Sequence, residues 1–250
     1  MESKITQSRF IESIRPLNAR FIKSSVGFKD SIPAECAEVA ILGRSNVGKS
    51  SFINTLLNHK LAKSSSTPGK TRLINFFKVD FEVKILDFNA DSKNFIESNL
   101  KDSIKNIESS PCKNADSKQS QTLKIPLIII DFPGFGYAKV DKKTRNLWDK
   151  NLSDFLAKRL SVKLFCHLID ARHRELEIDS NIAHFLESTL KNQQRIDYEI
   201  INIYTKADKL KKNELATLRH QNALTISTIK KDSKNLQEIY KIILIKTLGI

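Results

Sequence analysis

The sequence lacks the features that would place it among secreted, disulfide-bonded or membrane-spanning proteins. Its three cysteines, Cys36, Cys112 and Cys166, are odd in number and lack metal-ligand spacing, which is typical of a reducing cytosol. No stretch approaches the ~20 apolar residues of a membrane-spanning helix, and the N-terminus has no long apolar core, which argues against a secretory signal. We therefore expect a cytoplasmic protein without a membrane span. The five histidines also lack metal spacing, and His167, within an apolar run, is expected to be a satisfied core residue.

Acidic residues are too few to balance the basic ones. Lysine and arginine number 42 and aspartate and glutamate 28, which gives a formal net charge of +14 at pH 7. This excess favours a polyanionic partner such as nucleic acid, a ribonucleoprotein or an anionic membrane surface. Residues 139–163 carry eight basic against three acidic side chains, and residues 206–246 carry ten against four. These stretches are predicted to face RNA, although lysines spread over solvated helix faces would give the same counts.

Apolar residues make up 40% of the 250 residues, enough for the core of a single domain over 1–250. Apolar runs alternate with helical patterns, which predicts βαβ units and a mostly parallel sheet with helices on both faces. The predicted strands are 39–42, 74–81, 126–131, 164–169, 198–204 and 223–226, and the predicted helices are 49–59, 143–160, 178–191, 211–220 and 234–247. In such a sheet the ligand lies at the carboxyl ends of the strands.

Two segments depart from this alternation. Residues 87–124 carry six acidic and six basic side chains and are predicted to be a polar, partly disordered insertion. Apolar residues at helical spacing predict a helix near 92–109 within it, and the polar tail 109–122 is predicted to be a mobile loop. In the N-terminal extension 1–19, the apolar residues between 10 and 17 predict a short amphipathic helix.

The most informative run is Gly-Arg-Ser-Asn-Val-Gly-Lys-Ser at 43–50. It fits the pattern of a phosphate-binding P-loop and lies between an apolar run and a helical pattern, which is the setting that this motif needs. Gly43 and Gly48 let the backbone fold around an anion, and the positive end of the following helix adds to the attraction. Lys49 would reach the β- and γ-phosphates, and the Ser50 hydroxyl would bind Mg²⁺.

Thr-Lys-Ala-Asp at 205–208 closes a later apolar run and resembles a guanine-recognition element. The Asp208 carboxylate can accept from N1–H and from the exocyclic amino group of guanine, whereas adenine offers neither donor. A mismatch of this kind can discriminate by ~10⁴ or more. The stem of Lys206 would lie along the base, with its ammonium reaching back to the P-loop. Residues 226–228 follow a late strand and could support the base through backbone amides.

Two further segments lie between these motifs. Asp131 ends a buried strand and suits the second shell of Mg²⁺, and the amide of Gly134 could approach the γ-phosphate and move when that group leaves. Alternatively, this segment is an ordinary turn at the end of a strand, for which an Asp-x-Pro-Gly sequence is also suitable. In the loop 67–72, Thr67 and Thr71 are both candidates to complete Mg²⁺ coordination and to sense the γ-phosphate.

Taken in order, these elements resemble a TRAFAC-class GTPase and, more closely, the EngB (YihA/YsxC) family of bacterial ribosome-biogenesis GTP-binding proteins. The resemblance covers roughly residues 20–86 and 125–250. It is carried by GRSNVGKSS at 43–51, TPGKTR at 67–72, DFPGFGYAKV at 131–140, LIDARH at 168–173 and TKAD at 205–208. The family assigns no role to the 87–124 insertion, and a glycine usual after the late serine element is missing, with Ser233 near that place.

The resemblance implies a three-layer, Ras-like P-loop GTPase fold of the α/β class, with a mostly parallel six-stranded sheet that contains one antiparallel strand. It makes Thr71 the threonine that senses Mg²⁺, so that Ser50 and Thr71 are the predicted metal ligands and Lys49, Thr71 and Gly134 the predicted catalytic residues. The residues predicted to contact GTP or GDP are Gly43, Arg44, Ser45, Asn46, Val47, Gly48, Lys49, Ser50, Ser51, Gly69, Lys70, Thr71, Arg72, Leu73, Asp131, Phe132, Pro133, Gly134, Thr205, Lys206, Ala207, Asp208, Ile226, Ser227 and Thr228.

The residue after Gly134 bears on the rate of hydrolysis. Ras-like enzymes have a glutamine there that orients the attacking water, but Phe135 can neither donate nor accept a hydrogen bond. We therefore expect slow GTP hydrolysis by the isolated protein. The missing positive charge or alignment of water could come from a potassium ion near Asn46, as other P-loops of this class with an asparagine suggest. It could also come from a group on a ribosomal particle. Alternatively, Asn46 only caps the loop.

The function expected from these motifs and the resemblance is a GTP-binding switch that assists large ribosomal subunit assembly and is needed for normal cell division and septation. Its expected partner is a large-subunit precursor or ribosomal RNA, and the protein is expected to be a monomer. Gly136, Tyr137 and Lys139 could report the nucleotide state to that partner or could merely pack. Two alternatives remain: a signalling GTPase that recruits a protein effector without RNA contact, and a P-loop enzyme that uses GTP to drive chemistry on a small substrate.

Overall fold

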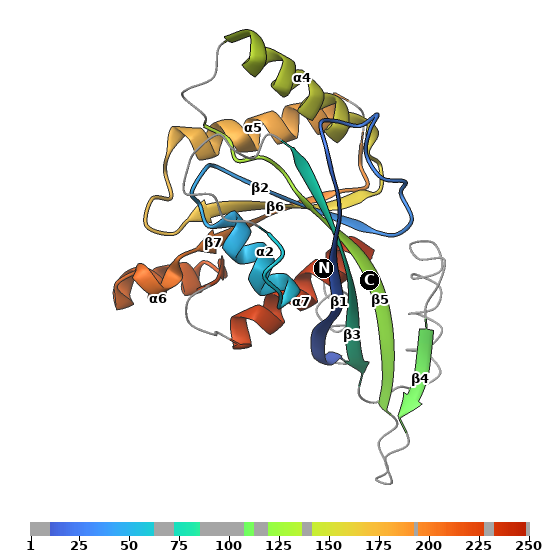
Figure 1. The fold of residues 1–250 in the computed structure, drawn as a ribbon. Coiled ribbons are helices and arrows are strands. Elements are labelled where there is room, and N and C mark those ends of the chain that lie inside the picture. Colours follow the sequence, from blue (N-terminus) through green and yellow to red (C-terminus); the bar gives the residue numbers. More distant parts are fainter. Residues whose placement is uncertain are drawn as a thin grey trace.

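A computed structural model describes residues 11–62, 73–85, 108–112, 120–136, 142–192, 195–227 and 233–248. Within them, eight strands form one sheet, with helices on both sides of it (Figure 1). The strands are β1 Ile11–Ser25, β2 Glu38–Gly43, β3 Ile74–Ile85, β4 Glu108–Cys112, β5 Ser120–Asp131, β6 Val162–Asp170, β7 Glu199–Thr205 and β8 Leu224–Thr225. The helices are α2 Lys49–Leu57, α4 Lys142–Lys158, α5 Glu177–Lys191, α6 Lys212–His220 and α7 Ser233–Leu248, and a 3₁₀ turn spans Ala207–Lys209.

The sheet has a parallel half and an antiparallel half. Its strand order is β1-β3-β5-β2-β6-β7-β8, and β4 pairs with β5 outside this path. Strands β5, β2, β6, β7 and β8 are parallel neighbours. Strand β3 is antiparallel to both β5 and β1, and β4 is antiparallel to β5. The predicted α/β class and mostly parallel sheet are confirmed, but the sheet has two strands more than the predicted six, and β4 joins β3 in running opposite to the rest.

The first additional strand corrects the predicted N-terminal helix. Residues 11–25 form β1, which pairs with β3 along its length. Pro16 explains the difference, because proline in a helix interior removes a backbone hydrogen bond and clashes with the preceding turn. An edge strand tolerates proline, and in β1 Pro16 lies opposite Phe81 of β3.

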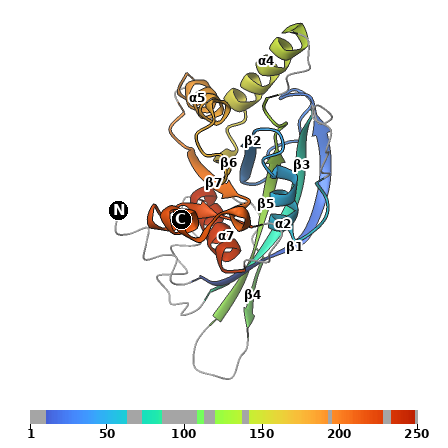
Figure 2. The same cartoon turned by 90° about the vertical axis from the view of Figure 1, so that its left-hand side faces the viewer.

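The second correction concerns the predicted loop at 109–122. Residues 109–112 belong to β4 and residues 120–122 to β5, and the two strands pair. Burial alternates along this part of β5, with Leu123 and Ile125 buried and Lys124 exposed, which is the period of a strand with one solvated face. Figure 2 shows β3 and β5 continuing past the parallel strands toward β4. The predicted helix near 92–109 ends within β4, and its residues 92–107 lie outside the described part of the chain.

The core lies on both faces of the sheet, which confirms the three layers. On one face, side chains of α2 and α7 such as Phe52 and Ile243 pack against the sheet, and on the other face side chains of α4 and α5 such as Phe155 and Leu186 do so. Strand β2, between these layers, is buried at every position. None of the helices in the described ranges combines the length and apolar character that a membrane crossing requires.

Candidate nucleotide-binding site

The predicted motifs meet at the carboxyl edge of the parallel strands. In the strand register, Ile41 of β2 lies opposite Asp131 of β5, and Asp170 of β6 lies opposite Thr205 of β7. The P-loop follows β2, so it lies between the segment that follows β5 and the one that follows β7. This edge is where ligands bind in open α/β sheets.

The P-loop turns sharply into helix α2. Gly48 precedes the helix with φ 101°, a left-handed conformation that glycine adopts without the steric cost that a side chain would bring. Asn46 also has a positive φ, 63°, which asparagine tolerates better than most residues. The turn places the first amides of α2 at the mouth of the loop, where a helix start leaves backbone donors without intrahelical acceptors.

The backbone carbonyls of the loop are held by donors from the protein itself. From Gly43 to Gly48, five carbonyl oxygens each accept a hydrogen bond, at 2.6 to 3.3 Å. In the order Gly43, Arg44, Asn46, Val47 and Gly48, the donors are the amides of Phe135 and Val47, the ammonium of Lys206, the hydroxyl of Thr205 and the amide of Phe52. With these acceptors engaged, the loop offers donors to a ligand, and together with the helix start it forms an anion cradle.

Lys49 is paired with the carboxylate at the end of β5. Its ammonium donates to Asp131, and both side chains are largely buried. The second oxygen of Asp131 accepts from the Asn75 side chain at 3.3 Å. A phosphate entering the cradle would therefore compete with Asp131 for Lys49. Ser50 follows Lys49, so a hydroxyl and a carboxylate oxygen lie on neighbouring segments, and this is the donor chemistry that Mg²⁺ prefers.

The predicted base-reading segment, Thr205–Asp208, is joined directly to the P-loop. The Thr205 hydroxyl donates to the Val47 carbonyl at 2.6 Å. The ammonium of Lys206 donates to the Asn46 carbonyl at 2.6 Å and to Asp170 at 2.9 Å. The predicted contact of the Lys206 ammonium with the P-loop is therefore present in the structure. Asp208 lies half-buried in the 3₁₀ turn that follows.

The predicted support from residues 226–228 is described in part. Ile226 lies beside the base-reading segment, because its amide donates to the Tyr204 carbonyl and its carbonyl accepts from the Ala207 amide. Ser227 follows it and is buried, two residues past the end of β8. Thr228 lies outside the described residues.

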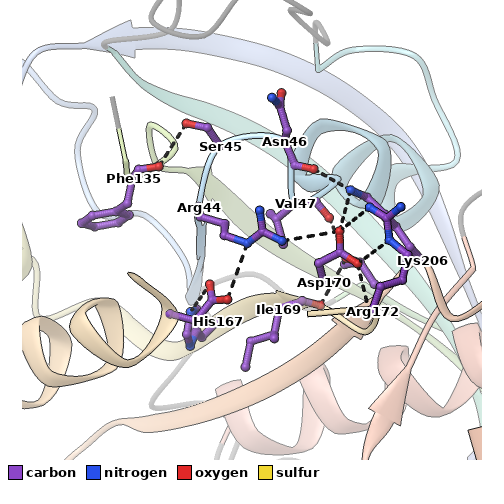
Figure 3. A network of polar contacts seen from close by, with 12 residues as sticks. Arg44, Ser45, Asn46, Val47, Phe135, His167, Ile169, Asp170, Arg172 and Lys206 are labelled. Atoms are coloured by element: carbon purple, nitrogen blue, oxygen red, sulfur yellow. Dashed lines mark hydrogen bonds and ion pairs between the residues drawn. The ribbon is translucent and has the colours of Figure 1, made fainter. Parts of the chain in front are cut away.

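Asp170 was not among the predicted site residues, yet it lies at the centre of the polar network (Figure 3). It accepts from Arg172 at 2.7 and 2.9 Å and from Lys206 at 2.9 Å. Burial alone would raise the pKa of this carboxyl, but the hydrogen bonds from Arg172 and Lys206 outweigh it and hold the pKa well below its usual range. The signal that could have found it is an aspartate that ends a buried strand at the ligand edge of the sheet.

Arg44 is one of the residues predicted to contact nucleotide, and its side chain has partners within the protein. Its guanidinium is directed toward β6 and α5, where Asp170 and Asp179 each lie 3.5 Å from one of its nitrogens. Figure 3 shows this guanidinium between the Asp170 carboxylate and the carboxylate next to His167. Any contact of Arg44 with nucleotide would thus come from its backbone.

Among the other predicted residues, one is buried in the core, two are exposed and several lie outside the described ranges. Phe132 is buried and packs on Phe155 with ring centroids 5.4 Å apart. Ser51 is exposed on α2, and Leu73, just before β3, is 38% exposed. Predicted residues whose structure is not described are Gly69, Lys70, Thr71 and Arg72, together with Thr67, Tyr137 and Lys139.

Phe135 occupies the position at which Ras-like enzymes have a glutamine that orients the attacking water. Its amide donates to the Gly43 carbonyl at 3.1 Å, and its carbonyl accepts from the Ser45 amide at 2.8 Å. Its ring packs on Phe185 of α5, with centroids 5.8 Å apart. The backbone is thus tied to the P-loop, while the side chain belongs to the contact with α5.

Known proteins are similar to this chain over most of its length. Residues 38–206 match the model of the family described as 50S ribosome-binding GTPase. The chain is 42% identical over 236 residues to the EngB GTP-binding protein of Campylobacter lari, covering 93% of this chain and 97% of that protein. It is 40% identical over 205 residues to the EngB protein of Helicobacter hepaticus, covering 82% of this chain and 74% of that protein.

A solved structure agrees at the level of the fold. The crystal structure of a point variant of Aquifex aeolicus Era bound to GDP·AlF₄⁻ superimposes with a TM-score of 0.50 and 21% identity, covering 84% of this chain and 56% of that one. Three observations lead to the same family: the P-loop GTPase fold, the contact between the phosphate loop and the predicted base-reading segment, and the sequence identity to the relatives named above. This chain belongs to the EngB family of GTP-binding proteins and is a GTPase.

Proposed function

We propose that the protein is a Mg²⁺-dependent guanine-nucleotide switch that assists assembly of the large ribosomal subunit. The observation that carries the nucleotide part is the direct contact between the phosphate loop and the base-reading segment, through Thr205 and Lys206. Support for the ribosomal part comes from the description of the matching family as ribosome-binding and from the net charge of +14. A protein that acts on ribosome precursors would be located in the cytoplasm.

Binding of GTP would use the residues of the site in distinct ways. The loop amides and the start of α2 would hold the phosphates, and Lys49 would exchange Asp131 for a phosphate oxygen. The stem of Lys206 would cover the base while Asp208 accepts from its N1–H and amino groups. Ser50 and Thr71 would hold Mg²⁺, with support from Asp131. When bound, Mg²⁺ neutralises charge on the phosphates.

The test of the nucleotide assignment is titration of the wild-type protein and of Asp208→Asn with GDP, GTP and ATP, with and without Mg²⁺. We expect the wild type to bind guanine nucleotides, and the variant to lose them by a factor on the order of 10⁴ or to turn toward xanthine nucleotides. Asp197→Asn is the matched control, because Asp197 pairs with Lys163 and Arg195 away from the site. Equal affinity of the wild type for ATP and GTP would refute the proposal.

Hydrolysis is proposed to be slow without help. The ring of Phe135 packs on Phe185 and could not orient water in any position, so a second agent is needed. One candidate is K⁺ near Asn46, whose backbone has the left-handed conformation described above. Steady-state GTP turnover should then rise when Na⁺ is replaced by K⁺, and equal rates in the two buffers would remove this candidate. The other candidate is a group from the ribosomal precursor, which added precursor particles would reveal.

The proposed partner is a large-subunit precursor or its RNA, contacted by basic side chains. Exposed basic side chains follow the base-reading segment along the chain, from the 3₁₀ turn through α6, and they are Lys209, Lys211, Lys212 and Arg219. Because such contacts release counterions, co-sedimentation with large-subunit precursors should weaken steeply between about 50 and 200 mM salt. Co-sedimentation that is absent, or insensitive to salt, would favour the signalling GTPase with a protein effector. The proposed role in cell division and septation would be indirect, because loss of the protein would impair the supply of ribosomes that division needs.

A further inference from the structure

The side chain of Arg44 links three elements of the fold. Arg44 leaves the end of β2, and its guanidinium lies 3.5 Å from Asp170 at the end of β6 and 3.5 Å from Asp179 in the first turn of α5. The Arg44 side chain is 17% exposed, and those of Asp170 and Asp179 are 1% and 4% exposed. The P-loop pattern itself sets no requirement for the residue at this position.

These contacts close a ring of interactions around the P-loop. Asp170 holds the Lys206 ammonium, and that ammonium donates to the carbonyl of Asn46, two residues after Arg44. The ring therefore runs from the P-loop through Arg44 to β6, through Lys206 to the base-reading segment, and back to the P-loop (Figure 3). Asp179 extends the same network to α5.

The contact with Asp179 is poorly satisfied for a buried ion pair. Among the described residues, the Nε of Arg44, both carboxylate oxygens of Asp179 and the Nε2 of His167 have no hydrogen-bond partner. Desolvation raises the pKa of Asp179, although the charge of Arg44 opposes this rise. A buried pair with this geometry is weak evidence for stability, and unsatisfied buried groups call for another explanation.

We propose that Arg44 is a positioning residue, which holds the P-loop in register with the base-reading segment through Asp170 and with α5 through Asp179. The inference rests on the guanine-nucleotide binding proposed above but makes a separate claim. It states that the Arg44–Asp179 pair acts on retention of the nucleotide, which it does not touch, beyond any effect on folding.

The experiment compares Arg44→Met, Asp179→Asn and the double variant by two readouts. The first is the rate of release of a fluorescent GDP analogue, and the second is urea unfolding of the nucleotide-free protein. Arg44→Met leaves a buried carboxylate without its partner, so we expect both lower stability and about tenfold faster GDP release. The double variant removes both charges and should recover most of the stability, because a buried pair replaced by neutral groups is often tolerated.

The double variant decides between positioning and a purely structural role. If Arg44 positions the P-loop, the double variant still releases GDP about tenfold faster than the wild type despite its recovered stability, and Asp179→Asn alone approaches the same rate. Arg15→Met is the matched control, since Arg15 pairs with Glu82 at the exposed edge of the sheet, and it should release GDP at the wild-type rate.

Recovery of both stability and GDP retention in the double variant would overturn the inference, and so would wild-type release rates in all three variants. The double variant keeps the test decisive even if Arg44→Met alone does not fold. Failure of the wild-type protein to retain GDP would overturn the proposed function together with this inference. If the wild type retains GDP and the double variant releases GDP at the wild-type rate, the inference about Arg44 would be overturned but the proposed function would stand.

Discussion

Two arginines that pair with buried carboxylates lie at opposite ends of strand β2, and their surroundings differ. At the start of the strand, Arg159 donates twice to Glu38, at 2.6 and 2.8 Å, and also to the carbonyls of Ile32 and Pro33. Glu38 accepts a further hydrogen bond from Ser161. After the end of the strand, Arg44 lies 3.5 Å from each of two carboxylates and leaves its Nε unsatisfied.

If Arg44 positions the P-loop as proposed, the two arginines have different roles in this fold. The Arg159–Glu38 pair is bidentate and its remaining donors have carbonyl partners, so it can offset much of its desolvation and fix one end of the sheet. The network around Arg44 recovers less of that cost, and it lies at the proposed nucleotide site. Strain and incomplete satisfaction are expected at sites that must respond to a ligand.

The largest effect is expected from breaking the well-satisfied pair. Arg159→Met strands the Glu38 carboxylate in the core, and we expect the free energy of unfolding to fall by about 3–5 kcal/mol. Urea unfolding measures this loss. GDP release from the folded fraction should stay at the wild-type rate, since Arg159 lies at the end of β2 away from the P-loop. A loss smaller than that of Arg44→Met would contradict the comparison.

A second prediction concerns pH at the ligand end of the sheet. Burial lowers the pKa of His167 to about 4, although a hydrogen bond with Asn202 acts in the opposite direction. The folded state therefore keeps His167 neutral while the unfolded chain protonates it, so its contribution to stability is complete above pH 6.5 and is lost as the pH falls toward 4. The loss is about 3 kcal/mol.

Urea unfolding at several pH values would measure this loss as the difference between wild type and His167→Gln. The difference is needed because Asp179, 3.9 Å from His167, has a raised pKa and acts in the opposite sense. Arg44, Asp170 and Lys206 belong to the same network, and the hydrogen bonds from Arg172 and Lys206 hold the pKa of Asp170 well below its usual range. Parallel pH profiles for wild type and variant would contradict the assignment.

The smallest effect is expected at Gly136, which lies against α5. It has φ 95°, and an added Cβ would meet the Ile178 Cδ1 at 2.5 Å. The end of an isoleucine side chain can move, so the backbone conformation dominates, and Gly136→Ala should cost about 1–2 kcal/mol. Gly27→Ala is the matched control, because its added Cβ would make only ordinary contacts. Thermal unfolding of both variants would measure the difference, and equal melting temperatures would count against a left-handed Gly136.

The parts of the site that depend on short-range pattern were predictable from the sequence. A strand, a glycine-bearing loop and a helix follow each other within 38–57, so the anion cradle could be inferred from residue types alone. The contact of Lys206 with the P-loop was also predicted and is confirmed. It follows from two motifs that each end a parallel strand at the same edge of the sheet.

The parts that depend on distant pairing were not predictable in the same way. The apolar spacing before residue 17 fits a helix, and only Pro16 argued against it, whereas β1 is held by pairing with β3 some 60 residues later. Arg44 and Asp170 are likewise far apart in sequence, so no local pattern could assign the guanidinium to β6 rather than to a phosphate. The alternation at Leu123 and Ile125 was the one local sign that β5 begins early.

The engaged carbonyls of the P-loop have a consequence for inhibitor design. Five of the six backbone carbonyls from Gly43 to Gly48 already accept hydrogen bonds from the protein, so the loop favours a ligand that brings negative charge over one that brings hydrogen-bond donors. In the proposed mode of binding, selection among purines comes from Asp208, in the turn that follows β7. A compound that mimics only the phosphates would therefore be captured by many unrelated enzymes, whereas one that also engages Asp208 would inherit the selectivity of the natural ligand.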